Sequence, residues 1–324
     1  MFKPAHINPD LLAVLEQRMH EMRGALDFTR MPPAHGRKIE LQFAMNERSL
    51  MPSVGSAVEI ILPNNSAPPL KALHVSPPTP RGGTILYIHG GGWAFGSHVT
   101  HQDQARRLSL ATGMMVVSIS YRLAPEHPFP AGLNDCIAAW HALSGGRIVG
   151  VPAVGPLILA GDSAGANLAL AAMLNEIDAG GPLPDAALLF YGVYGDNFNT
   201  PSYKQWADGP VLTRAKMQRF WDWYCPKSYR QDYRAVPLLA PATHLETLPP
   251  LFMAAAEIDP LLSENEQLFR VFAADTTRND TFTIWPGMVH AALGFANRVD
   301  QVREHVVHAG RWVQSKFPIN AAKY

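Results

Sequence analysis

The sequence predicts an α/β fold built on a mainly parallel β-sheet, and two observations carry that prediction. Short apolar runs recur after residue 83, and they are continuous rather than alternating: 84–88, 114–119, 157–160, 187–190 and 251–254. Strands that are apolar along their whole length are buried on both faces. Helical patterns lie between them at 102–111, 131–143 and 164–177, and this alternation is typical of βαβ units.

The composition supports a folded chain with a large core and weighs against two classes of partner. Of the 324 residues, 47% are hydrophobic and 17% are charged, which is the balance of globular proteins. The 27 basic and 27 acidic residues cancel, so the net charge favours neither nucleic acid nor an anionic membrane as a partner. No apolar run reaches the roughly 20 residues of a spanning helix, and residues 1–6 lead into no signal peptide. We therefore expect a cytoplasmic protein.

The elements before residue 83 follow from capping and periodicity. Asn8 offers a capping side chain, and apolar residues follow at helical spacing, which predicts a helix over 9–23. The β-rich runs 58–62 and 70–75 are expected to be edge strands of the sheet. At the other end, we expect a strand over 282–285, a turn at Pro286-Gly287 and a final helix over 299–313.

Residues 195–236 interrupt the alternation of strands and helices. This segment is rich in aromatic residues and follows one core strand without entering another directly. We interpret it as an excursion that covers one end of the sheet, together with the N-terminal helix. The alternative is a helical insertion that only packs on the core, because Trp and Tyr are common in cores and in binding surfaces.

Two cysteines are present and carry no recognisable chemistry. Cys136 and Cys225 lie far apart and lack the paired spacing of a zinc site. We expect both to be buried thiols, with a disulfide as the alternative.

The strongest chemical signal is the pentapeptide Gly161-Asp162-Ser163-Ala164-Gly165. It follows an apolar strand and opens a helix, which is the context of a nucleophile elbow. The glycines remove side chains that would collide in the sharp turn, and the helix N-terminus favours negative charge near Ser163. The alternative is an ordinary small-residue turn between a strand and a helix.

The second signal is the run His89-Gly90-Gly91-Gly92-Trp93, directly after the strand 84–88. Its side-chain-free backbone can point N–H groups into a site, as an oxyanion hole requires. It fits neither phosphate-binding glycine pattern. We expect His89 to be a hydrogen-bonding residue of this loop rather than a general base.

A serine nucleophile needs a base and a group that orients the base. The base should lie on a loop after a late strand, and His290 is the histidine in that position. The orienting acid should lie at another strand end, and Asp259 directly follows the run that ends at residue 258. The order Ser163, Asp259, His290 is that of α/β-hydrolases. The other candidates, which we consider weaker, are the acids Glu257 and Glu264 and the histidines His127, His305 and His308.

These motifs together resemble those of the hormone-sensitive-lipase family of α/β-hydrolases, which contains many bacterial esterases. The resemblance covers residues 55–316 and includes the segments 89–93, 121–131, 161–169, 256–261 and 286–290. It implies an eight-stranded, mostly parallel sheet flanked by helices, with core segments 51–194 and 237–324 and a cap formed by 1–50 and 195–236. Residues 192–195 and 259–262 are similar to the acetyl-esterase branch, which implies hydrolysis of short acyl esters, from acetyl to about hexanoyl.

The resemblance also implies a role for each site residue. Ser163, Asp259 and His290 would form the catalytic triad. The backbone N–H groups of Gly91, Gly92 and Ala164 would form the oxyanion hole, and Trp93 would contact the substrate. The substrate would be a small-molecule ester, with no metal or organic cofactor.

Two other functions share part of these motifs. Kynurenine formamidases carry a similar His-Gly-Gly-x-Trp loop, so an amide or formamide hydrolase is one alternative. Plant gibberellin receptors resemble the family but lack the catalytic histidine, so a non-catalytic receptor is a remote second alternative.

A homodimer is common among the relatives, and this sequence neither requires nor excludes it.

Overall fold

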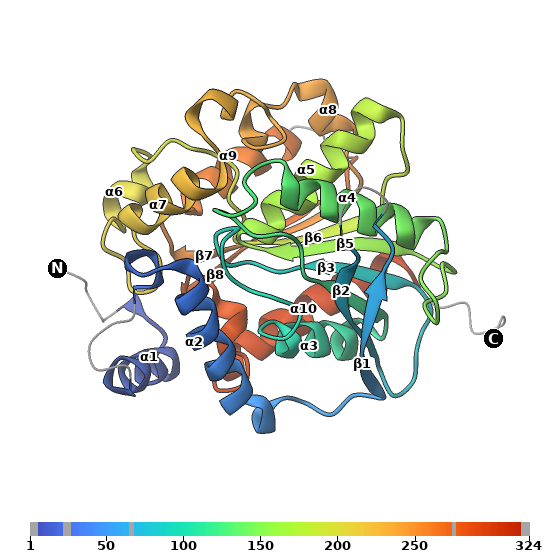
Figure 1. The fold of residues 1–324 in the computed structure, drawn as a ribbon, viewed down its shortest axis with the longest axis horizontal. Coiled ribbons are helices and arrows are strands. Elements are labelled where there is room, and N and C mark those ends of the chain that lie inside the picture. Colours follow the sequence, from blue (N-terminus) through green and yellow to red (C-terminus); the bar gives the residue numbers. More distant parts are fainter. Residues whose placement is uncertain (1–5, 22–26, 65–67, 274–276, 319–324) are drawn as a thin grey trace.

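The computed structural model describes residues 6–21, 27–64, 68–273 and 277–318. Residues 1–5 and the last two residues of the expected helix 9–23 lie outside these ranges. Within the described residues, one eight-stranded sheet runs through the molecule in the order β1-β2-β4-β3-β5-β6-β7-β8 (Figure 1). The strands are β1 (Ser56–Leu62), β2 (Leu70–Ser76), β3 (Thr84–Ile88), β4 (Met115–Ile119), β5 (Leu157–Asp162), β6 (Ala186–Phe190), β7 (Leu251–Ile258) and β8 (Thr281–Val289).

The sheet is parallel from β4 to β8, whereas β1 pairs with β2 and β2 pairs with β4 in antiparallel fashion. Every residue of β3, β4 and β6 is buried, as the continuous apolar runs predict. Leu86 of β3, for example, pairs with Val117 on one side and with Leu159 on the other. The central strands therefore form a rigid platform that fixes the loops at their ends.

Helices cover both faces of the sheet. In Figure 1, α3 and α10 lie on one face, while α4, α5, α8 and α9 lie on the other. The helices are α1 (Pro9–Glu21), α2 (Pro33–Asn46), α3 (Gln102–Thr112), α4 (Ala131–Ser144), α5 (Ala164–Ala179), α6 (Pro201–Gln205), α7 (Arg214–Tyr224), α8 (Ala242–Thr247), α9 (Leu262–Ala273) and α10 (Asp300–Lys316). Short 3-10 helices span Phe28–Arg30, Arg48–Leu50, Lys227–Tyr229, Pro237–Leu239 and Ala292–Phe295.

Four helices gather at one side of the molecule although they come from two distant parts of the sequence. These are α1, α2, α6 and α7, on the left in Figure 1. Helix α1 begins where expected, because the Asn8 side chain accepts hydrogen bonds from the amides of Asp10 and Leu11. Among the described residues, no helix is both long enough and apolar enough to cross a bilayer.

The structure corrects two expectations about strands. The run 70–75 is not an edge strand, because β2 lies between β1 and β4. The last strand does not end at a turn: β8 continues through Pro286-Gly287 to Val289, and a register shift opposite Glu257 accommodates the extra residues. Pro286 and Gly287 fall at this shift, between the pairs Ala256–Trp285 and Ile258–Val289, and β8 has no neighbour on its other side, so the missing N–H of Pro286 costs no ladder hydrogen bond. Gly287 adopts a φ of 68°.

The two cysteines are free and buried, as expected. Cys136 lies in α4, and Cys225 directly follows α7. Both side chains belong to the larger apolar cluster of the core. Their contribution is therefore packing.

Candidate active site

Ser163 sits at the turn between β5 and α5 in a conformation that few residues adopt. Its φ of 54° and ψ of −120° lie outside the common regions for a residue with a side chain. Gly165 allows this turn, because a Cβ there would collide with the carbonyl oxygen of Ile88 in the neighbouring strand. The Ser163 amide donates to the carbonyl of Phe190, 2.9 Å away, which ties the turn to β6. The serine hydroxyl is thereby presented at the N-terminus of α5.

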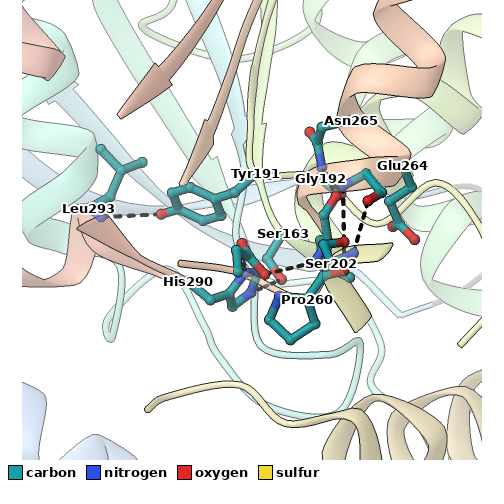
Figure 2. A network of polar contacts seen from close by, with 12 residues as sticks. Ser163, Tyr191, Gly192, Ser202, Pro260, Glu264, Asn265, His290 and Leu293 are labelled. Atoms are coloured by element: carbon teal, nitrogen blue, oxygen red, sulfur yellow. Dashed lines mark hydrogen bonds and ion pairs between the residues drawn. The ribbon is translucent and has the colours of Figure 1, made fainter. Parts of the chain in front are cut away.

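The structure brings Ser163, His290 and Asp259 together in one hydrogen-bonded row, of which Figure 2 labels Ser163 and His290. Ser163 Oγ lies 2.9 Å from His290 Nε2, and His290 Nδ1 lies 2.7 Å from Asp259 Oδ2. All three side chains are buried, with exposures of 6%, 6% and 1% for Ser163, His290 and Asp259. They follow the carboxyl ends of β5, β8 and β7, where the functional groups of a parallel sheet converge.

The loop that carries Asp259 is fixed by neighbouring polar groups, several of which are drawn in Figure 2. Asp259 Oδ1 accepts a hydrogen bond from the amide of Leu261, 2.9 Å away. The Ser202 hydroxyl donates to the carbonyl of Pro260, and the amides of Ser202 and Ser263 each donate to the other residue's hydroxyl. The carboxylate of Asp259 therefore has little freedom to turn away from the imidazole.

A second set of contacts holds the imidazole of His290. The ring of Tyr191 packs edge-on against it, with ring centres 5.2 Å apart. The Tyr191 hydroxyl accepts a hydrogen bond from the amide of Leu293 (Figure 2). The imidazole is thus confined between the aromatic ring and the Asp259 carboxylate.

The alternative acids are not brought to the imidazole. Glu257 accepts a hydrogen bond from the Gly287 amide and so stabilises the irregular part of β8. Glu264 is buried in α9, and its Oε1 accepts from the amide of Tyr194, 2.7 Å away. Burial raises the pKa of Glu264 well above its ordinary range, while the amides of Tyr194 and Gly195 oppose this rise. Each of these two carboxyl groups therefore holds a backbone segment in place instead of contacting the imidazole.

The alternative histidines also lie elsewhere. His127 is exposed in the proline-rich connector. On α10, His305 stacks on Trp285, and His308 packs edge-on against Phe252. The hydroxyl of Ser163 is bonded to His290 instead.

The glycine-rich loop lies beside Ser163. We define the glycine loop as residues 89–96. Gly91 and Gly92 line the same cavity as Ser163 and His290, and Gly91 adopts a φ of 107°, which a residue with a side chain rarely reaches. As expected, His89 is a buried residue of this loop: its Nδ1 lies 2.7 Å from the carbonyl of Gly90, and its ring stacks on Tyr121.

Trp93 lies elsewhere than expected. Its side chain is 1% exposed, and the described residues that line the cavity do not include it. The indole stacks on Tyr224 at 4.1 Å, and its Nε1 donates to Asn167 Oδ1 at 3.2 Å. Because the φ of Trp93 is positive, the chain turns this side chain into the contact with α7 instead of toward the serine. Trp93 therefore joins the glycine loop to α7 and α5.

Asp162 is a site residue that sequence reasoning missed, although it occupies the variable position before Ser163. Its Oδ1 accepts hydrogen bonds from the Tyr87 hydroxyl at 2.6 Å and from the Gly90 amide at 2.9 Å. Burial raises the pKa of Asp162, and these two donors oppose the rise. Asp162 thus joins the nucleophile turn to the glycine loop, while Asp259 contacts the histidine.

A cavity of about 410 Å³ opens onto Ser163 and His290. Its apolar walls include four phenylalanines: Phe28, Phe95, Phe220 and Phe295. Glu40 of α2 and Lys216 of α7 also line it, and neither was singled out from the sequence. Among the described residues, no three His, Cys, Asp or Glu side chains are grouped to hold a metal ion.

The sequence is similar to those of hydrolases with known activities. Residues 85–294 match a protein family described as having the alpha/beta hydrolase fold. The chain is 36% identical over 216 residues to the carboxylesterase NlhH of Mycobacterium tuberculosis, covering 65% of this chain and 67% of that protein. It is 32% identical over 247 residues to an acetyl-hydrolase of Streptomyces hygroscopicus, covering 74% of this chain and 78% of that protein.

The fold is also similar to that of an esterase with a solved structure. A thermostable esterase from Pseudomonas putida superposes on this chain with a TM-score of 0.87 at 29% sequence identity. The match covers 99% of this chain and 100% of that one. It therefore extends over the N-terminal helices as well as over the sheet.

Proposed function

Since the chain belongs to the α/β-hydrolase family and is a carboxylic ester hydrolase of the hormone-sensitive-lipase type, we propose that Ser163, His290 and Asp259 are its catalytic triad. The observation that carries this proposal is the row of contacts from Ser163 Oγ to His290 Nε2 at 2.9 Å and from His290 Nδ1 to Asp259 Oδ2 at 2.7 Å. The proposed reaction is hydrolysis of short-chain acyl esters through an acyl-enzyme.

In the first half of the reaction, Ser163 Oγ attacks the ester carbonyl and His290 Nε2 takes its proton. Asp259 Oδ2 accepts a hydrogen bond from the Nδ1–H group of His290 and stabilises the imidazolium that forms. The imidazolium then protonates the leaving alcohol oxygen as the carbon–oxygen bond breaks. In the second half, water attacks the acyl carbonyl while His290 Nε2 takes its proton. The imidazolium then returns this proton to Ser163 Oγ as the bond between Oγ and the acyl carbon breaks and the acid leaves.

The negative charge on the tetrahedral intermediate needs hydrogen-bond donors. We assign this role to the backbone N–H groups of Gly91, Gly92 and Ala164. The position of both glycines on the cavity wall supports this assignment, and so does the position of Ala164 as the first residue of α5. A helix N-terminus favours negative charge, which adds to the stabilisation.

We further assign residues 1–50 and 195–236 to a cap over a core formed by 51–194 and 237–324. The cavity supports this division, because Phe28 and Glu40 come from the first segment and Phe220 from the second. The four phenylalanines on its wall favour apolar acyl groups, and the similarity to the acetyl-hydrolase of Streptomyces hygroscopicus supports short ones. The substrate is accordingly a small-molecule ester with a short acyl chain.

The test is a rate profile on p-nitrophenyl esters from acetate to decanoate, with N-formylkynurenine as the formamide competitor. We expect the highest kcat/KM between acetate and hexanoate and negligible turnover of the formamide. A maximum at decanoate would contradict the short-chain assignment. A large preference for N-formylkynurenine would instead identify a formamide hydrolase.

A further inference from the structure

Helix α2 contacts the glycine loop through Arg37, a residue outside the region 85–294 that matches the hydrolase family. The Arg37 guanidinium donates from Nε to the carbonyl of Ala94 at 2.7 Å and from a terminal nitrogen to the carbonyl of Ala124 at 2.8 Å. Both terminal nitrogens also bind the Glu126 carboxylate, at 3.0 and 2.7 Å. One side chain of α2 therefore joins the end of the glycine loop to the connector that follows β4.

Glu40 makes the complementary contact one helical turn later. Its Oε2 accepts a hydrogen bond from the amide of Gly96 at 2.9 Å. On the same face of α2, Gly36 lies so close to the Phe95 ring that an added Cβ would come within 2.7 Å of it. Three consecutive loop residues, at positions 94–96, thus contact one face of this helix.

The opposite end of the glycine loop is held by the core. The Gly90 amide donates to Asp162, and the Tyr121 hydroxyl donates to the carbonyl of His89 at 3.0 Å. The segment between these two anchors contains Gly91 and Gly92. Glycines restrict the backbone least, so the direction of their N–H groups depends on every contact that fixes the loop. Besides the two ends, these are the packing of Trp93 and the hydrogen bonds from the Ala94 and Phe95 amides to the Gly91 carbonyl, which link Gly91 directly to the residues held by α2.

The chemistry of Arg37 fits a positioning role better than a role in stability. The Arg37 and Glu126 side chains are 26% and 48% exposed, and an ion pair of this kind contributes little to folding stability. The planar guanidinium, however, presents five donors in a fixed arrangement that can serve several acceptors at once. Lysine could not reproduce this pattern.

We propose that Arg37 and Glu40 are positioning residues that hold Gly91 and Gly92 in the direction required for the oxyanion hole. This inference rests on the proposed function. The N-terminal segment then controls the rate of acyl transfer through the backbone of the glycine loop, in addition to lining the cavity. Loss of either contact lowers kcat, whereas a wall that only binds substrate would change KM.

The experiment compares Arg37→Ala, Glu40→Ala and Glu40→Gln with Lys38→Ala, an exposed residue of the same helix, as the matched control. kcat and KM are measured on p-nitrophenyl acetate, and thermal unfolding establishes that each variant is folded. Affinity for a trifluoromethyl ketone is the second measurement. Ser163 Oγ adds to its carbonyl carbon and His290 takes the serine proton, so the resulting oxyanion occupies the oxyanion hole.

We expect Arg37→Ala and Glu40→Ala to lower kcat by about 10-fold, since removal of a whole oxyanion donor costs about 10²- to 10³-fold. KM should stay nearly constant, and the ketone should bind more weakly in proportion. Glu40→Gln should recover most of the loss, because its amide oxygen can accept from Gly96. Lys38→Ala should behave like the unmodified protein.

Unchanged kcat in folded Arg37→Ala and Glu40→Ala would overturn the proposal, as would a rise in KM at constant kcat. A Glu40→Gln variant as slow as Glu40→Ala would overturn it as well. Failure of the proposed function gives a different result, namely ester hydrolysis that persists in Ser163→Ala. The two outcomes are therefore distinguishable.

Discussion

At the scale of single residues, two neighbouring carboxylates have different roles because of what each one contacts. Asp259 lies 2.7 Å from His290 Nδ1, whereas Asp162 accepts from Tyr87 and from the Gly90 amide. The first can orient and stabilise an imidazolium, and the second can fix a loop. Residue type alone does not distinguish them.

The contact with His290 leads to a test of the proposed acid. We expect Asp259→Asn to lower kcat on p-nitrophenyl acetate by about 10⁴-fold, because an amide in place of the carboxylate favours the wrong imidazole tautomer. Glu264→Gln is the matched control, since it changes the other buried acid near the strand ends and preserves an acceptor for the Tyr194 amide. Equal losses in the two variants would contradict the assignment of Asp259.

Glu40 gives a pH-dependent prediction about stability. Burial raises its pKa from an ordinary value of 4.5 to about 7, while the Gly96 amide and Arg37 oppose this rise. Between these two values the folded protein holds a proton that the unfolded chain has released. Rising pH therefore lowers this group's contribution to the free energy of unfolding.

Glu40→Gln removes this ionisation. We expect its melting temperature to rise relative to that of the unmodified protein as the pH increases from about 5 to about 8. Thermal unfolding monitored by circular dichroism at several pH values measures the difference. A difference that stays constant over this range would show that Glu40 does not titrate with a raised pKa.

At the scale of elements, the central strands could be predicted because burial leaves a direct trace in the sequence. The run 84–88 shows no alternation of apolar and polar residues, and β3 has these bounds. The continuation of β8 through Pro286-Gly287 could not be predicted, because a proline and a glycine are tolerated there only by an edge strand whose partner shifts register. Position in the sheet is a tertiary property that local pattern does not contain.

The same limit applies to the site. Motif spacing placed Ser163, Asp259 and His290 in one candidate group, and the structure brings these side chains together. Asp162 and Glu40 were missed because each holds the glycine loop through a backbone amide that is distant in sequence, that of Gly90 or of Gly96. A backbone amide has no identity that a sequence pattern could reveal.

Helix α5 allows a matched comparison of two glycines. We expect Gly165→Ala to cost about 3 kcal/mol or more, because its Cβ would collide with the Ile88 carbonyl. Gly180 caps the other end of α5 with a φ of 62° and no atom within 4 Å of an added Cβ. Gly180→Ala should therefore cost only about 1–2 kcal/mol of backbone strain. Denaturant unfolding measures both, and equal losses would contradict the close approach at Gly165.

At the scale of the whole molecule, the cavity is assembled from parts that are distant in the chain. Ser163 and His290 come from strand ends, Glu40 from α2, and Phe220 from α7. An added Cβ at Gly92 would meet the Phe220 ring at 2.5 Å, so this ring lies directly over the glycine loop. Acyl preference therefore depends on how the outer helices sit on the sheet.

Phe220 tests this dependence. We expect Phe220→Ala to enlarge the cavity and to raise kcat/KM for octanoate relative to acetate by about 10-fold, since each buried methylene contributes about 0.8 kcal/mol. Tyr229→Ala is the control, because Tyr229 lies in the same segment and is 56% exposed. An unchanged chain-length profile would place the acyl group elsewhere in the cavity.

The central claim, that Ser163 is the nucleophile of a serine esterase, is tested most directly by covalent labelling with diethyl p-nitrophenyl phosphate. This reagent phosphorylates an activated serine and releases p-nitrophenol. We expect one adduct per chain, located on Ser163 by peptide mass spectrometry and formed in step with loss of esterase activity. His290→Ala should react far more slowly. Labelling at another residue, or full activity after Ser163 is labelled, would contradict the claim.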